Sequence, residues 1–201
     1  MVADADGNFY GTTYSGGIAG CAQDFGCGTV FKIAPDGSEA IVYKFQGGSD
    51  GAAPFSSLIL DKMGNLYGTT SAGGGSGCNG GGCGTVFKIA PDGTETILHA
   101  FQGGSDGAVP YAAVIADQSG NLFGTTSLGG DPKHFCTGQI SGCGTVFELA
   151  PDRTETLLKV FDVRHEHIPR AGLVADNKGN LYGSTSAALR YSGVIFEISQ
   201  P

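Results

Sequence analysis

The chain has 201 residues, of which 36 are glycine and 8 are proline, far above the usual glycine share of roughly 7 %. Since glycine costs about 1 kcal/mol relative to alanine inside a helix, this composition excludes a mainly helical protein, and a hydrophobic share of 40 % excludes disorder. The net charge of −8 argues against nucleic acid as a partner, and no apolar stretch approaches the roughly 20 residues of a membrane span.

Two sequence blocks recur in the same order along the chain. The block Gly-Asn-Phe-Tyr-Gly-Thr-Thr at 7–13 returns almost unchanged at 64–70, 120–126 and 179–185. The block Cys-Gly-Thr-Val-Phe-Lys-Ile-Ala-Pro-Asp-Gly, which begins at Cys27, returns from Cys83, from Cys143 and, degraded, from Ser192. The chain therefore consists of four units that repeat about every 57 residues, the last of them truncated.

Each unit is predicted to contain four strands, as the second unit illustrates. Its first strand is the short apolar run 57–60, and its second, 65–71, is rich in β-branched and aromatic residues. A glycine-rich loop leads to the third strand, 84–90, and the tight turn 91–94 leads to the fourth, 95–101. Four antiparallel strands per unit, repeated in tandem, predict an all-β protein, a β-propeller of four-stranded antiparallel blades with the apolar run innermost.

We expect a single domain over 1–201, with blades at 1–47, 54–103, 110–163 and 169–201 and no outer strand in the last. Four blades suffice for a small closed ring. If the blades instead have the geometry of a larger ring, a second copy of the chain is expected to complete an eight-bladed homodimer, because the blade faces at both ends would otherwise be exposed. Both arrangements agree with the sequence.

The connections between strands sort onto two faces. The turns between first and second strands are short and alike, whereas two other connections are longer and more varied. These are the loop from the second to the third strand, here called the cysteine loop, and the connection from the fourth strand to the next unit, here called the crossover. Both leave the same end of an up-and-down blade. Because variable loops on a rigid scaffold commonly carry function, we expect binding on this loop face.

Six cysteines fall in pairs, one pair in each of the first three cysteine loops, and the fourth unit lacks both members. Joint presence and joint absence predict three local disulfides, Cys21–Cys27, Cys78–Cys83 and Cys136–Cys143, with free thiols or metal thiolates as the alternatives. Disulfides persist in oxidising compartments, and such bonds would stiffen the loop face.

The repeat resembles the bacterial tandem repeat of the GloVer type, found in proteins with interchangeable C-terminal surface anchors. The resemblance rests on Gly-Asn-Leu-Tyr-Gly-Thr-Thr-Ser, on Gly-Cys-Gly-Thr-Val-Phe-Lys-Ile-Ala-Pro-Asp-Gly and on Phe-Gln-Gly-Gly-Ser-Asp-Gly-Ala-x-Pro, and it covers essentially the whole chain. It implies an exported protein with no settled catalytic activity. We therefore expect an extracellular or cell-surface location, with signal and anchor absent from this stretch of sequence.

The candidate binding residues lie on the predicted loop face. Asp50 and Asp106 stand in Gly-Gly-Ser-Asp-Gly segments, where they either bind a hydroxylated ligand or an ion, or form ordinary turns. The other candidates are polar, basic and aromatic residues of the third and fourth units: His134, His165, Glu166, His167, Arg170, Arg190 and Tyr191. In an extended segment the imidazoles of His165 and His167 would lie on the same side, where they could bind a metal ion. No third ligand is identifiable in the sequence, and a solvated loop is the alternative.

The turn at residues 4–7 resembles the start of a calcium-binding loop. Asp4 and Asp6 stand at alternate positions before Gly7, as at the start of a calcium loop, but the distal bidentate Glu is missing. A tight turn capped by Asp4 is the leading interpretation, and no cofactor is predicted, with calcium as the alternative.

The leading functional hypothesis is an extracellular β-propeller that binds a glycan or a surface protein through its loop face. No nucleophile elbow, phosphate-binding loop or zinc-protease helix is present in the sequence. The first alternative is a polysaccharide hydrolase or lyase that uses acids or histidines of the same face, since carboxylates of different blades can meet there. The second alternative is a purely structural surface repeat.

Overall fold

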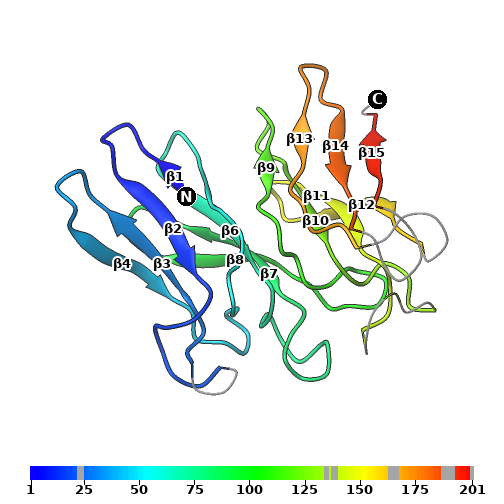
Figure 1. The fold of residues 1–201 in the computed structure, drawn as a ribbon, viewed down its shortest axis with the longest axis horizontal. Helices are drawn as coiled ribbons and strands as arrows, with labels where there is room; N and C mark the ends of the chain where they lie inside the picture. Colours follow the sequence, from blue (N-terminus) through cyan, green and yellow to red (C-terminus); the bar gives the residue numbers. More distant parts are fainter. Residues whose placement is uncertain (22–24, 134–135, 137–139, 163–167, 187–192, 200–201) are drawn as a thin grey trace.

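The computed structural model describes residues 1–21, 25–133, 136, 140–162, 168–186 and 193–199. Within these ranges the chain forms strands and turns, and none of it is a helix that could cross a membrane. The strands make up four antiparallel sheets, one from each repeat, of which three have four strands and the last has three (Figure 1). The predicted all-β architecture of antiparallel sheets is confirmed.

In every sheet the strands follow their order along the chain. The first sheet contains β1 (Val2–Ala3), β2 (Phe9–Thr13), β3 (Thr29–Ile33) and β4 (Glu39–Lys44). The second contains β5 (Ile59–Leu60), β6 (Leu66–Thr70), β7 (Thr85–Ile89) and β8 (Glu95–Ala100). The third contains β9 (Ile115–Ala116), β10 (Leu122–Thr126), β11 (Thr145–Leu149) and β12 (Glu155–Val160). The fourth contains β13 (Val174–Ala175), β14 (Leu181–Ser184) and β15 (Ile195–Ile198).

The second strand of each sheet contains a glycine that the third strand requires. Gly68 of β6 lies opposite Phe87 of β7, and a Cβ on Gly68 would stand 2.6 Å from Cζ of Phe87 and 2.8 Å from Cδ2 of Leu58. The same pairing recurs as Gly11–Phe31, Gly124–Phe147 and Gly183–Phe196. A glycine inside a strand is normally unfavourable, so its recurrence here records the close approach of an aromatic ring.

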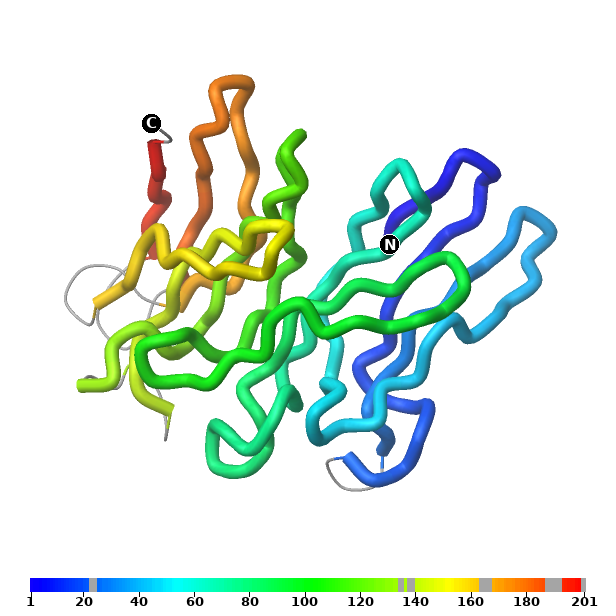
Figure 2. Tube along the Cα trace, turned by 180° about the vertical axis from the view of Figure 1, so that it is seen from behind, coloured from blue at the N-terminus to red at the C-terminus, as the bar shows by residue number. Residues whose placement is uncertain are grey.

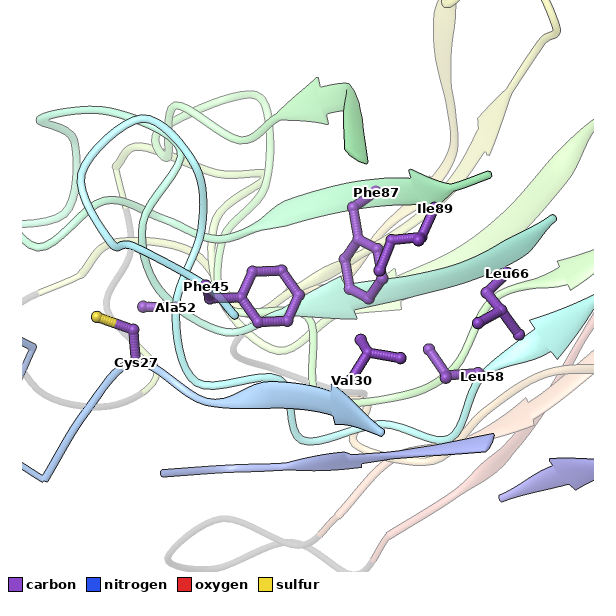
Figure 3. Packing of buried hydrophobic residues seen from close by; sticks show 8 residues of the cluster. All are labelled: Cys27, Val30, Phe45, Ala52, Leu58, Leu66, Phe87 and Ile89. Carbon is purple, nitrogen blue, oxygen red and sulfur yellow. The ribbon is translucent and has the colours of Figure 1, made fainter. Parts of the chain in front are cut away.

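The apolar core lies between neighbouring sheets. In Figure 3, Val30 and Phe45 of the first unit face Leu58 and Phe87 of the second. The phenylalanine that begins each crossover packs edge-on against the phenylalanine in the third strand of the next sheet, with ring centroids 5.0 Å apart for Phe45–Phe87, 5.3 Å for Phe101–Phe147 and 5.1 Å for Phe161–Phe196. All three junctions between sheets are therefore built alike.

A β-bulge interrupts the outer hairpin of the first three sheets. In the second sheet Val86 pairs with His99 and Phe87 with Ile97, so Leu98 is the extra residue. The same shift occurs in the hairpins β3–β4 and β11–β12. A bulge increases local twist and re-aims the side chains next to it. In this sheet His99 lies next to the bulge, near the end of the outer strand.

In the described part of each crossover, one non-glycine residue lies in the left-handed region, immediately before a proline. Ala53, Val109 and Ile168 have φ values of 56°, 57° and 59°. The N–H of Val109 donates to the carbonyl of Cys83 at 2.8 Å, and its own carbonyl accepts from the N–H of Ser127 at 3.1 Å. Positive φ at a β-branched residue costs on the order of 1–3 kcal/mol. The crossover tolerates this because it is hydrogen-bonded to the unit before it and to the unit after it.

The two ends of the array of sheets are uncovered in the described part of the chain. On the leading face of the first sheet Phe9 is 48 % exposed, whereas the equivalent Leu66 of the second sheet is 3 % exposed. On the trailing face of the last sheet Ile195 is 84 % exposed, and its equivalent Val146 is fully buried. The first and last sheets lie at opposite ends of the array (Figures 1 and 2). Completion of a ring by a second chain stays a prediction.

Candidate functional site

The cysteine loops and crossovers gather at one end of the sheets, on the lower side of Figure 1. The predicted disulfides Cys21–Cys27, Cys78–Cys83 and Cys136–Cys143 are all formed. A Cβ on Gly103 would lie 3.3 Å from Sγ of Cys78 and 3.2 Å from Sγ of Cys83, so this disulfide packs directly against the crossover of its own unit. The three disulfides stiffen the loop face and are consistent with an oxidising, extracellular location.

Asp50 and Asp106 close the loops in which they stand. Asp50 accepts hydrogen bonds from the hydroxyl of Tyr43 at 2.9 Å and from the N–H of Gln46 at 2.6 Å. Asp106 accepts from the N–H of Gln102 at 2.6 Å, and its other oxygen lies 3.2 Å from Nε2 of His99. The ordinary turn that was the alternative interpretation accounts for these bonds. Any binding role of the two carboxylates is in addition to that structural one.

A glutamate from the next unit approaches each of these aspartates at the outer edge of the sheets. The first rim junction consists of Tyr43, Asp50 and Glu95. The second rim junction consists of His99, Asp106 and Glu155.

Both glutamates are poorly solvated carboxyl groups. Glu95 and Glu155 each have a buried Oε1 atom without a hydrogen-bond partner in the described structure. Burial, and then the charge of Asp50, raises the pKa of Glu95 to about 7. Burial also raises the pKa of Glu155, reinforced by its hydrogen bond to Asp106. Burial acts in the same direction on Asp106, but hydrogen bonds with His99, Glu155 and the Gln102 N–H outweigh it and lower the pKa of that group.

The short turns on the opposite face are closed by their own aspartates. Oδ1 of Asp61 accepts from the N–H groups of Met63 and Asn65, and Oδ2 accepts from Nδ2 of Asn65 at 2.7 Å and from the hydroxyl of Tyr67 at 3.0 Å. Asp4 makes the equivalent bonds in the first turn. These donors occupy the carboxylates within the turn, as the capped-turn interpretation predicts.

An aromatic row crosses three units on the loop face, and all of its members are exposed except Tyr111, which is half-buried. The rings of Tyr14 and Phe55 lie 5.9 Å apart, those of Phe55 and Tyr111 lie 5.6 Å apart, and the guanidinium of Arg170 lies 5.7 Å from the ring centre of Tyr111. Tyr14 is 54 % exposed and Phe55 63 %. Phe55, Tyr111 and Arg170 each follow the proline of a crossover, so the repeat places them at equivalent positions. Tyr14 follows β2 at the start of the first cysteine loop.

The structure describes only some of the residues predicted to bind. Arg170 is exposed and joins the aromatic row. Six other candidates lie outside the described residues: His134, His165, Glu166, His167, Arg190 and Tyr191.

The aromatic row and the two glutamates were not predicted from the sequence. A signal for the row exists in the repeat, because the residue after the crossover proline is Phe55, then Tyr111, then Arg170. A second signal is the first residue of the outer strand, which is a glutamate in each of the first three units (Glu39, Glu95 and Glu155). Aligning the units position by position would have pointed to both.

Residues 1–196 match the family described as the Gloeobacter/Verrucomicrobia repeat. No curated protein is significantly similar to the chain in sequence.

Three solved structures share the fold at low sequence identity. A luciferin-regenerating enzyme is 14 % identical in sequence and gives a TM-score of 0.58. The match covers 98 % of this chain and 59 % of the enzyme chain. A protein described as a putative gluconolactonase is 18 % identical and gives a TM-score of 0.51. The match covers 85 % of this chain and 56 % of that protein. The periplasmic gluconolactonase of Pseudomonas aeruginosa is 16 % identical and gives a TM-score of 0.50. The match covers 87 % of this chain and 47 % of the gluconolactonase. The chain thus spans less than two thirds of each of these proteins.

Proposed function

The chain belongs to the Gloeobacter/Verrucomicrobia repeat family, and from this premise we propose that it is an extracellular β-propeller module that binds a glycan through the aromatic row on its loop face. The fold supports the propeller, since the gluconolactonase-like structures to which it is similar have that architecture. The disulfides support an oxidising location. The observation that carries the proposal is the row itself, in which Tyr14 and Phe55 are exposed and Tyr111 is half-buried.

The chemistry of the row suits a sugar chain. Aromatic rings offer apolar faces on which the C–H faces of pyranose rings stack, while a phenolic hydroxyl or a guanidinium reaches the hydroxyl groups. Single exposed apolar residues are common on proteins, but Tyr14, Phe55 and Tyr111 are contiguous and held edge-on to one another. Arg170 ends the row with a planar donor group that also suits the carboxylate of an acidic sugar.

The backbone that carries Phe55 and Tyr111 is held by hydrogen bonds, which favours binding. Phe55 follows a crossover segment whose backbone is fixed at Ala53 by hydrogen bonds to Cys27 and Ser71. Tyr111 follows the same arrangement at Val109. Groups that are already ordered lose little conformational freedom on binding, so more of the contact energy appears as affinity.

The hydrolase alternative has less support from the described carboxylates. One carboxylate pair from different units on the rim is Asp106 and Glu155, whose metal-ligating atoms lie within 4.8 Å of each other and which share a hydrogen bond. Glycosidases instead hold their two carboxyl groups about 5–5.5 Å apart when retaining, or about 6.5–9.5 Å apart when inverting, with substrate between them. The pair is therefore closer than either mechanism requires.

The proposal is tested by measuring affinity for a panel of soluble neutral and acidic polysaccharides. Phe55→Ala and Tyr111→Ala are each expected to weaken binding about tenfold, which is roughly 1.4 kcal/mol of lost stacking. Phe9→Ala is the matched control, because Phe9 is comparably exposed at 48 % but lies on the leading face of the first sheet. Release of reducing ends would favour the hydrolase. Binding to no polysaccharide would contradict the proposal and favour a protein partner or a structural role.

A further inference from the structure

The second rim junction brings three side chains with metal-ligating atoms to one point. Nε2 of His99 lies 3.2 Å from Oδ1 of Asp106 and 3.7 Å from Oε2 of Glu155. The three ligand atoms lie within 4.8 Å of one another, and all three residues are half-buried. They come from strand β8, from the crossover that follows it and from strand β12 of the next sheet. The junction therefore depends on two sheets being packed together.

We propose that His99, Asp106 and Glu155 form a binding site for a divalent transition-metal ion of the Zn²⁺ type. At metal–ligand distances of about 2.0–2.1 Å, two ligands of a tetrahedral site lie about 3.3 Å apart. The separations of 3.2 Å and 3.7 Å between the imidazole nitrogen and the two carboxylate oxygens lie close to this value. Small side-chain adjustments therefore suffice to admit an ion, with water as the fourth ligand.

The donor set favours a transition metal over calcium. Imidazole nitrogen is a preferred ligand of Zn²⁺ and its neighbours in the first row, whereas Ca²⁺ takes six to eight oxygen ligands. The junction supplies one nitrogen and two carboxylates. This site is separate from the turn at Asp4, where carboxylate oxygens are already bound to the turn.

The surroundings hold the three ligands in place. The ring of His99 packs edge-on against Phe101 with centroids 4.7 Å apart, and Oδ2 of Asp106 accepts the Gln102 N–H at 2.6 Å. The Cys78–Cys83 disulfide packs on Gly103 in the same crossover. Such contacts orient ligands before an ion arrives, as outer-shell partners do in metal sites.

A buried carboxylate oxygen provides a second, independent observation. Oε1 of Glu155 is buried without a hydrogen-bond partner in the described structure. Buried polar atoms are nearly always hydrogen-bonded or bound to an ion, so this atom needs a compensating group. Oε1 of Glu95 at the first rim junction is also buried and unpartnered in the described structure, so the imidazole of His99 is what distinguishes the second junction. A cation at the junction would supply the missing positive charge beside two neighbouring carboxylates.

The first rim junction serves as an internal control. It has the same aspartate and glutamate, Asp50 and Glu95, but Tyr43 stands where the second junction has His99. A neutral phenol is a poor ligand for Zn²⁺ compared with imidazole. The proposal therefore assigns metal binding to the second junction and not to the first.

Calorimetric titration of the chelator-treated full chain with Zn²⁺ tests the proposal, together with Co²⁺ absorption spectra to report nitrogen and oxygen coordination. The wild type is expected to bind one ion per chain at this site. His99→Tyr, which converts the second junction into a copy of the first, is expected to weaken binding about tenfold or more. Glu95→Gln is the matched control and should leave Zn²⁺ affinity unchanged.

A gain-of-function variant keeps the test independent of any loss of folding. Tyr43→His gives the first junction the ligand set of the second, and it is expected to add a second equivalent of Zn²⁺. Circular dichroism and thermal melting establish that each variant is folded. Absence of saturable Zn²⁺ binding in the wild type, or unchanged binding in folded His99→Tyr, would overturn the proposal, as would a Tyr43→His variant that gains no ion.

Discussion

The two ends of each sheet differ in how strictly their side chains repeat from unit to unit. At the end with the short turns, Asp61 and its counterparts make the same hydrogen bonds to the following asparagine in unit after unit. At the loop face the backbone also repeats, but its side chains change, from Tyr43 to His99 and from Phe55 to Tyr111. Residues that recur identically build the sheets. Residues that vary on a constant backbone are the candidates for function.

This difference predicts that buried repeat residues dominate stability. Phe87 is fully buried between the first and second sheets, so Phe87→Ala is expected to lower the free energy of unfolding by about 3–5 kcal/mol in urea denaturation. The matched control is Phe31→Ala, because Phe31 holds the same position in the first sheet but is only half-buried on the leading face. Equal losses in the two variants would show that the leading face is covered in solution.

Substitution of a turn aspartate should have the next largest effect on the free energy of unfolding. Asp61→Ala removes the acceptor of four hydrogen bonds and is expected to cost about 1–3 kcal/mol at neutral pH. Burial opposes ionisation of Asp61, but the hydrogen bonds from Asn65 and its neighbours lower its pKa below 3.8. Its contribution is therefore present above that pH and is lost as the pH falls through the lowered value.

Urea denaturation of wild type and Asp61→Ala at neutral pH and in acid measures this effect. Asp6→Ala, which removes an exposed acid of the first turn, is the control and should change little. A difference between wild type and Asp61→Ala that persists unchanged in strong acid would contradict the assignment to an ionised carboxylate.

The rim junctions should give the opposite pH dependence, and a smaller effect. The pKa of Glu95 rises from 4.5 to about 7 on folding, so the unfolded chain ionises first and stability falls as the pH rises from about 4.5 to about 7. After allowance for solvent screening at this half-buried site, the loss is about 1–2 kcal/mol. Glu95→Gln should reduce the fall in thermal stability over this pH range, while the raised pKa of Glu155 keeps part of it. An unchanged slope would show that Glu95 is well solvated in the folded protein.

Much of the fold follows from the sequence because it rests on local, repeated signals. Alternating strands, the turn at Asp61 and the cysteine pairs each repeat, and the sheets and disulfides are present as predicted. The first strand was predicted too long: 57–60 pairs only at Ile59–Leu60, because Leu58 packs into the core between sheets as part of the crossover.

The candidate site was harder to predict from the sequence because it depends on contacts between units. Glu155 reaches His99 only through the twist and packing of two sheets, which no local pattern encodes. The aromatic row likewise joins residues more than 40 positions apart, such as Tyr14 and Phe55. Asp50 and Asp106 were predicted from their loops, but their hydrogen bonds are those of turns.

The central claim is that the varied positions of the loop face bind a glycan. Affinity electrophoresis in gels containing polysaccharide tests it most directly, with Phe55→Ala/Tyr111→Ala compared against Phe9→Ala/Ile41→Ala. The control residues Phe9 and Ile41 are large and exposed, at 48 % and 52 %, but lie on the first sheet away from the row. The account predicts that retardation by the polysaccharide is lost only in the first double variant. Equal retardation of both double variants would contradict it.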